Sequence, residues 1–81
     1  MNLRYTKHFY RSFSRLSEET KNKFRKQEKF LLIEIRYPSL HAKKFDETQG
    51  IWQARVDDDF RFYFQIVGDI YLILDIRRHP K

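Results

Sequence analysis

The sequence predicts a single α+β domain with the element order β-α-α-β-β-β, in which two N-terminal helices pack on one face of a mainly antiparallel sheet. Three observations predict this class. The N-terminal half has apolar residues at helical spacing, and the C-terminal half alternates apolar and polar residues over three segments. The chain has 81 residues, enough for one core of about two layers. Residues 1–81 are therefore expected to form one domain.

The N-terminal half is expected to hold a short strand and two helices. Asn2–Tyr5 fits the strand, and Thr6 is suited to cap the first helix. Ser17 can cap the second helix, which has acidic residues in its first turn. Because the residue before a proline favours extended backbone, this helix should end near Arg36, ahead of Pro38. The apolar faces of the two helices are predicted to consist of Phe9, Phe13 and Leu16, and of Phe24, Leu31 and Ile35.

From Ile51 onward the apolar period becomes two, which predicts three strands. Every strongly apolar residue of these strands except Ile51 and Ile73 has an even number. Residues directly opposite on adjacent antiparallel strands share a face, so even must pair with even. Each hairpin loop should then hold an odd number of residues, and the simplest loops are residues 57–59 and 67–69.

This register places the even-numbered side chains under the helices and gathers polar side chains on the odd face. Arg55 is predicted to lie opposite Arg61, and Arg61 opposite Asp75. The expected odd face consists of Gln53, Arg55, Arg61, Tyr63, Asp75 and Arg77, with His79 at the end of the last strand.

Two arginines directly opposite on one sheet face repel each other, and a phosphate between them would reverse the sign of that interaction. Arginine also has the shape for bidentate phosphate contacts and stays charged at any working pH. The alternative is structural, with Asp75 neutralising Arg61 across the strands while Arg55 points to solvent. The residues alone leave both interpretations open.

Further candidates lie beside this face. Lys43 and Lys44 precede the first long strand and are expected at the rim of the odd face, although a lysine pair in a loop is more often a solubilising surface. His79 carries the side chain type best suited to proton transfer near neutrality. Its place near the chain end also fits a solvated bystander.

Composition narrows the function classes. The formal net charge of +6 favours an anionic partner, either nucleic acid or an acidic protein, over a merely solvated basic surface. The absence of cysteine excludes disulfides, thiolate catalysis and zinc-thiolate sites. His8, His41 and His79 lie too far apart in sequence for metal-ligand spacing, so we expect no metal and no cofactor. No membrane span or signal peptide is apparent, which predicts a cytoplasmic protein.

Four segments in this order resemble the RelE/ParE toxin superfamily. They are W-Q-A-R-V at residues 52–56, F-R-F-Y-F-Q at 60–65, Y-L-I-L-D-I-R-R-H at 71–79, and L-H-A-K-K at 40–44. The last of these is similar to the family's L-x-x-K-L loop. With the two leading helices, the resemblance covers essentially the whole chain.

The resemblance implies a β-α-α-β-β-β fold and the toxin of a type II toxin-antitoxin system, bound by an acidic antitoxin. In the RelE branch, which we favour, it implies a metal-independent endoribonuclease that cleaves mRNA, usually in the ribosomal A site, and so inhibits translation. Messenger RNA and the ribosome are then expected partners. Two other functions stay open because one fold serves several roles. They are a ParE-like toxin that inhibits DNA gyrase without nuclease activity, and an inactive relative that only binds its antitoxin or RNA.

The resemblance also assigns roles to residues. The family's phosphate-binding arginine of the middle strand matches Arg61, and the basic residue of the preceding strand matches Arg55. His79 matches the terminal histidine of many members, and Lys43 and Lys44 match the basic loop. The predicted RNA-binding residues are Tyr63, Tyr71, Arg77 and Arg78. The sequence lacks the tyrosine that often follows the last strand, so the first two of these are the candidates for base stacking.

Overall fold

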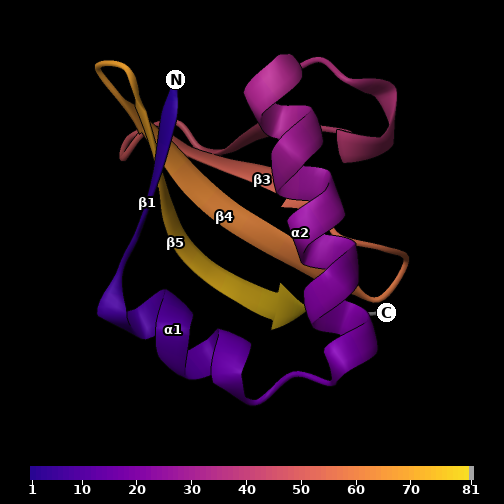
Figure 1. The fold of residues 1–81 in the computed structure, drawn as a ribbon. Helices are drawn as coiled ribbons and strands as arrows, with labels where there is room; N and C mark the ends of the chain where they lie inside the picture. The colour runs from indigo at the N-terminus through magenta and orange to yellow at the C-terminus, as the bar shows by residue number, and fades with distance from the viewer. Residues whose placement is uncertain (81) are drawn as a thin grey trace.

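Two helices lie on one side of a five-stranded mixed sheet in the computed structural model, which describes residues 1–80 (Figure 1). The elements are β1 (Asn2–Tyr5), α1 (Lys7–Ser14), α2 (Glu18–Ile33), the 3₁₀ turn η1 (Pro38–Leu40), β2 (Lys43–Asp46), β3 (Ile51–Arg55), β4 (Phe60–Val67) and β5 (Ile70–Arg78). The strand order is β1-β5-β4-β3-β2, with β1 parallel to β5 and the other neighbours antiparallel. The predicted α+β class is confirmed. Among residues 1–80, no helix is long and apolar enough to span a membrane.

The strand β2 is one more than the sequence predicted, so the order is β-α-α-β-β-β-β. Lys43 of β2 lies opposite Gln53, and Lys44 lies opposite Trp52. The strand was not predicted because Phe45 is its one apolar residue and none of its side chains is buried. No apolar alternation therefore marks it in the sequence.

Both predicted helix N-caps are confirmed. The Thr6 hydroxyl oxygen accepts a hydrogen bond from the backbone N–H of Phe9 at 3.0 Å, and the Ser17 hydroxyl oxygen accepts one from Thr20 at 3.2 Å. Such a cap contributes about 1 kcal/mol. The Thr6 hydroxyl also donates to the carbonyl oxygen of Leu74 at 2.9 Å. The residue that starts α1 therefore also ties it to β5.

The helix α2 ends at Ile33, ahead of the predicted end near Arg36. The next residue, Glu34, has extended backbone with φ −165° and ψ 130°. The reason is a ring contact, because Tyr37 stacks on Phe30 with 4.0 Å between the ring centroids. The chain must reverse directly after the helix to make this contact.

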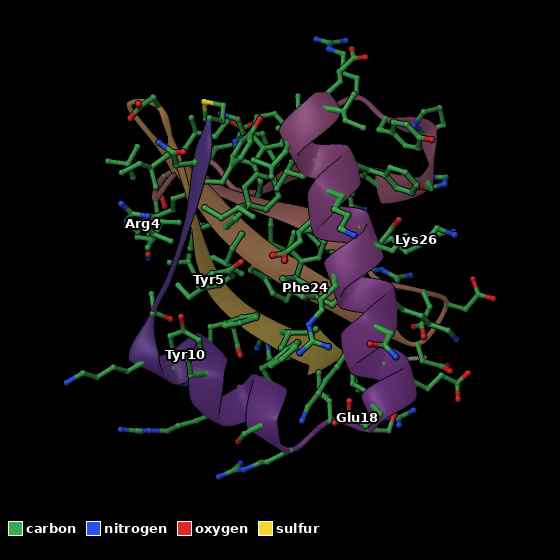
Figure 2. All side chains as sticks on the ribbon, viewed as in Figure 1. Arg4, Tyr5, Tyr10, Glu18, Phe24 and Lys26 are labelled. Carbon is green, nitrogen blue, oxygen red and sulfur yellow. The ribbon has the colours of Figure 1, made fainter. Side chains whose placement is uncertain are left out.

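The core lies between the helices and the sheet and consists mainly of phenylalanine. The rings of Phe9 and Phe24 have centroids 5.2 Å apart, and Phe24 meets Phe62 edge-on, also at 5.2 Å. Figure 2 shows Phe24 pointing from α2 toward the sheet. The largest fully buried side chains are Phe9, Phe24, Phe62, Phe64, Leu31, Leu40, Ile73 and Ile76. Since each contributes roughly 1.5–3 kcal/mol by burial, the core decides which face of each strand turns inward.

The first hairpin has the predicted loop over residues 57–59. The backbone N–H of Val56 donates to the carbonyl oxygen of Phe60 at 3.0 Å, so the two residues that flank the loop are paired with each other. The next pair is Arg55 opposite Arg61, as the parity argument predicted.

The predicted loop of the second hairpin, residues 67–69, is wrong. Val67 pairs with Ile70, so the turn contains residues 68–69 alone. Gly68 has φ +60°, and a positive φ is what short hairpin turns require at this position. A two-residue turn pairs odd-numbered residues with even-numbered ones, so the parity of β5 is shifted by one beside the turn.

A β-bulge corrects this shift further along the hairpin. Phe64 pairs with Ile73 and Tyr63 pairs with Asp75, which leaves Leu74 as the extra residue. Before the bulge the odd-numbered residues of β5 face the core, and after it the even-numbered residues do. The predicted parity therefore holds only for the C-terminal part of β5.

A hydrogen bond joins β1 to α2 at the edge of the core. The hydroxyl of Tyr5 donates to Oε2 of Glu28 at 2.7 Å. Burial raises the pKa of the Glu28 carboxyl, although this hydrogen bond and the charges of Arg25 and Lys29 oppose the shift. Burial, followed by the contact with Glu28, also raises the pKa of Tyr5.

The substitution Glu28→Gln should stabilise the protein near neutral pH. A carboxyl whose folded-state pKa is raised contributes stability below its ordinary pKa and loses it as pH rises through the folded-state pKa. Glutamine does not titrate and still offers an oxygen to Tyr5. Urea unfolding between about pH 4 and pH 8 should show a growing advantage of the variant as pH rises. Glu47→Gln, at an exposed position, is the control, and the same pH trend in both variants would contradict the assignment.

Candidate functional site

Three arginines lie side by side on the sheet face opposite the helices. Arg55 of β3 is opposite Arg61 of β4, and Arg61 is opposite Arg77 of β5. We call these residues the arginine row. The predicted pairing of Arg61 with Asp75 is wrong, because the two-residue turn and the bulge each shift the register by one residue and together place Asp75 opposite Tyr63. Like charges in cross-strand positions destabilise a sheet, so the row carries a cost that a bound anion would remove.

Within residues 1–80, neither Arg55 nor Arg61 forms an ion pair with a carboxylate. The Nη1 atom of Arg61 donates to the carbonyl oxygens of Asp57 at 2.6 Å and Phe60 at 3.0 Å. These carbonyl groups fix the guanidinium without neutralising it. The alternative interpretation, in which Asp75 neutralises Arg61, is therefore wrong.

Asp75 instead anchors the third member of the arginine row. Its Oδ2 atom lies 3.3 Å from Nε of Arg77 and 3.1 Å from Nε2 of His8 on α1. Its Oδ1 atom accepts a hydrogen bond from the backbone N–H of Ile76 at 2.8 Å. Asp75 is 9% exposed, so this contact holds Arg77 in place beside Arg61.

The loop between β3 and β4 positions two site residues. Oδ1 of Asp57 accepts hydrogen bonds from the backbone N–H groups of Asp59 and Phe60, both at 2.8 Å. The carbonyl oxygen of Asp57 accepts from Arg61, and that of Asp59 accepts from the backbone N–H of His79 at 2.6 Å. One ordered turn thus holds the side chain of Arg61 and the backbone of His79.

Gln27 of α2 supports the site from the core side. Its Nε2 atom donates to the carbonyl oxygens of Arg55 at 2.7 Å and Ser39 at 3.1 Å, and its Oε1 atom accepts from the Ser39 hydroxyl at 3.1 Å. The sequence analysis missed Gln27, although a polar residue within the stripe of Phe24 and Leu31 is the signal that marks it. Nε of Arg55 is buried and has no hydrogen-bond partner among the described residues.

The side chains around the first two arginines enclose a hollow of about 490 Å³, which we call the central depression. Its lining residues are His41, Ala42, Lys43, Gln53, Ala54, Arg55, Arg61 and His79. Four of the five residues predicted to be catalytic thus come together here. The volume lies in the range of small-ligand sites, roughly 300–1,000 Å³.

Lys44 is the fifth residue, and its predicted position beside Lys43 is wrong. Successive residues of a strand point to opposite faces, so Lys44 shares the helix-side face of Trp52. Its Nζ atom lies 5.3 Å from the centre of the Trp52 ring. The sequence analysis had placed both lysines in a loop, where this alternation does not apply.

A second hollow of about 340 Å³, the aromatic depression, adjoins the first through Gln53 and His79. Its lining residues are Phe45, Gln53, Tyr63, Arg77, Arg78, His79 and Pro80. Phe45 meets the ring of Tyr63 edge-on at 4.9 Å, and the guanidinium of Arg77 lies 4.6 Å from that ring. Three of the four predicted RNA-binding residues gather here. Phe45 was missed, although an aromatic residue beside two lysines is a recognisable signal.

Tyr71 is the fourth, and its predicted availability for base stacking is wrong. The side chain is 6% exposed and meets Phe64 edge-on at 5.6 Å within the core. Burial raises the pKa of its hydroxyl. The cause is the two-residue turn at Gly68, which shifts the parity of β5 at this position.

A third hollow of about 460 Å³, the lysine depression, adjoins the central depression through His41 and Arg55. Its lining residues are Lys23, Lys26, Gln27, Ser39, His41, Arg55, Val56 and Asp57. Lys23 is paired with Glu19 at 3.4 Å and with Asp57 at 3.5 Å. The hydrogen bond to Glu19 is the main cause of a raised pKa of Lys23. Figure 2 shows Lys26 on the side of α2 away from Phe24.

The three depressions form a series, because each shares two residues with the next. They run from the aromatic side chains, past Arg55 and Arg61, to the lysines of α2. This arrangement suits an extended polyanion with planar groups at one end. Among residues 1–80, no three histidine or acidic side chains gather as metal ligands.

The substitution Gln27→Met should destabilise the protein by about 1–3 kcal/mol, because it leaves the part-buried carbonyl groups of Ser39 and Arg55 without their donor. The similar side-chain volume limits any cavity. Urea unfolding at neutral pH measures the loss. Lys29→Met, on the same helix, is the control and should change stability little. Equal stability of wild type and Gln27→Met would show that these hydrogen bonds do not hold the site.

The solved structures that are similar to this chain share one fold. No protein-family model and no curated protein matches the sequence. The YoeB/ParE toxin from Agrobacterium tumefaciens superposes with a TM-score of 0.82 and 15% identity, covering 99% of this chain and 100% of that one. The archaeal RelE-RelB complex from Pyrococcus horikoshii superposes with a TM-score of 0.78 and 16% identity, covering 95% of this chain and 92% of that one. The RelBE2 toxin-antitoxin complex from Mycobacterium tuberculosis superposes with a TM-score of 0.74 and 17% identity, covering 96% of each chain. The predicted resemblance is thus confirmed at the level of structure, and the chain has the fold of the RelE/ParE toxins.

Proposed function

We propose that the protein is the toxin of a type II toxin-antitoxin system and a metal-independent endoribonuclease that cleaves mRNA on the ribosome, in the cytoplasm. One observation carries the proposal. Arg55 and Arg61 are cross-strand partners, neither is paired with a carboxylate within residues 1–80, and both line one depression with His79. The fold supports it, because its structural neighbours include proteins described as toxins and toxin-antitoxin complexes.

A phosphodiester group fits the central depression chemically. A phosphate oxygen would accept from the guanidinium groups of Arg55 and Arg61 and offset their repulsion. Lys43 lines the same depression and adds a further positive charge. The net charge of +6 favours a polyanion over a single small anion.

The aromatic depression favours a single-stranded nucleic acid. Unpaired bases stack on exposed aromatic rings, at about 1–3 kcal/mol per base. Phe45 is 53% exposed and packs edge-on against Tyr63, so its ring offers such a surface. Arg77 and Arg78 supply charge beside it. A strand lying here would place its neighbouring phosphate in the central depression, because the two hollows adjoin.

The proposed reaction is an attack of the RNA 2′-hydroxyl on its own adjacent phosphorus. A new P–O2′ bond forms and the P–O5′ bond breaks, which yields a 2′,3′-cyclic phosphate and a free 5′-hydroxyl. All reacting atoms belong to the RNA, so the protein supplies orientation, charge and proton transfer. Arg61, with Arg55 and Lys43, stabilises the negative charge of the phosphorane, and His79 exchanges protons.

An acidic antitoxin is the proposed protein partner. The basic net charge of +6 favours association with an acidic chain. The RelBE2 structure from Mycobacterium tuberculosis, which has the same fold, is a toxin-antitoxin complex.

The substitution Arg61→Ala should lower the rate of mRNA cleavage about 10²-fold to 10³-fold, because it removes a charge donor to the phosphorane. Primer extension on mRNA in translating ribosomes measures the cleavage, and growth after induction measures toxicity. Antitoxin binding should be largely retained. Arg11→Ala on α1, away from the three depressions, is the control. Undiminished cleavage by Arg61→Ala would refute the assignment of Arg61.

The wild-type reaction should leave 2′,3′-cyclic phosphate and 5′-hydroxyl ends, because the attacking oxygen is the RNA's own 2′-hydroxyl. End-group analysis of the cleaved RNA by mass spectrometry tests this. A supercoiling assay with DNA gyrase tests the ParE-like alternative in parallel. Inhibition of gyrase with intact mRNA would replace the nuclease proposal by that alternative. If the protein neither cleaves mRNA nor inhibits gyrase but still binds its antitoxin, it is the inactive relative.

A further inference from the structure

We infer that His41 is a second catalytic residue, which transfers one of the two protons of the reaction while His79 transfers the other. The inference rests on the proposed ribonuclease activity. Its basis is the central depression, which both histidines line together with Arg55 and Arg61. The sequence analysis had counted His41 only among the scattered histidines.

The chemistry requires two proton transfers. The 2′-oxygen must lose a proton as it attacks, and the 5′-oxygen must gain one as it leaves. The attacking and leaving oxygens of an in-line displacement lie on opposite sides of the phosphorus. A single imidazole on one side cannot serve both oxygens at once. Two imidazoles on opposite sides of the phosphate can.

The two histidines come from opposite sides of the pair Arg55 and Arg61, because His41 precedes β2, the neighbour of β3, and His79 follows β5, the neighbour of β4. His41 also lines the lysine depression, on the side of Arg55. His79 also lines the aromatic depression, on the side of Tyr63. A phosphate held between Arg55 and Arg61 would therefore lie between the two imidazoles. This is the arrangement that in-line attack needs.

The backbone at His41 supports a functional role. It has φ 46° and ψ 44°, in the left-handed region, and is the one non-glycine residue with positive φ among residues 1–80. The side chain is exposed, so core packing does not account for the conformation. Glycine would adopt it without strain. Strained non-glycine residues of this kind concentrate at functional sites.

The turn that carries His41 is held firmly. Leu40 is fully buried, and Ser39 is hydrogen-bonded to Gln27 through both its carbonyl and its hydroxyl group. The backbone N–H of His41 donates to the carbonyl oxygen of Pro38 at 3.3 Å. The titratable and charged residues that line the two depressions with His41 are Lys23, Lys26, Lys43, Arg55, Asp57, Arg61 and His79.

The test compares wild type with His41→Asn and His79→Asn. Asparagine tolerates left-handed backbone, so His41→Asn should keep the wild-type Tm. Single-turnover cleavage of mRNA bound to ribosomes is measured between about pH 5 and pH 9. Wild type should show a bell-shaped profile, and each variant should lose one limb and about 10²-fold to 10⁴-fold in rate. Arg36→Asn, exposed in the same connection, is the control and should match wild type.

A second substrate separates the acid from the base. Short mRNA with a bridging sulfur in place of the scissile 5′-oxygen needs no proton on its leaving group. It should restore the rate of one histidine variant and leave the other slow. A full bell-shaped profile in His41→Asn, or restoration of both variants or of neither, would overturn the inference. Absence of cleavage by wild type would instead refute the proposed function.

Discussion

The repulsion within the arginine row is the unfavourable interaction that the rest of the structure must offset. Arg55, Arg61 and Arg77 lie in cross-strand positions, where like charges favour separation of the strands. The phenylalanine core on the other face opposes this. A slip of one residue would turn Phe62 and Phe64, both fully buried, into solvent and bring the arginines under the helices. The hydrophobic face thus keeps the charges together.

Polar contacts complete what the core begins. The carbonyl of Asp57 receives Arg61, Asp75 receives Arg77, and Gln27 holds the backbone of Arg55. The contacts with Arg55 and Arg61 involve no carboxylate, and only Arg77 has one as a partner. The site is therefore rigid and still positively charged, which is the condition for tight interaction with an incoming anion.

The part of the fold that follows from apolar period was predictable. Thr6 and Ser17 cap the helices as expected, and the pair of Arg55 and Arg61 follows from the even-numbered apolar residues of β3 and β4. The start of β5 was not predictable in this way. Its run of Ile, Tyr, Leu, Ile and Leu is apolar at every position, so parity cannot tell a two-residue turn with a bulge from a three-residue loop. The misplacement of Tyr71 follows directly.

The site residues whose positions follow from the register of the predicted strands could be predicted. Those that depend on the connection between α2 and β3 could not. Arg55, Arg61 and His79 lie together because the sheet register brings them together. Phe45 and Lys44 depend on β2, which has no buried side chain to reveal it. His41 depends on the left-handed backbone after η1, and a local conformation of a single residue leaves no periodic signal.

The parallel pairing of β1 with β5 joins the first strand of the chain to the last. The bond from Thr6 to Leu74 spans 68 residues of sequence. During synthesis, β1 and α1 leave the ribosome long before their partner strand exists, and α1 has no β5 to pack on. The last strand also brings Arg77 and His79. The sheet of a nascent copy consequently stays incomplete, and the site lacks Arg77 and His79, until the segment that encodes β5 and the residues directly after it has been translated.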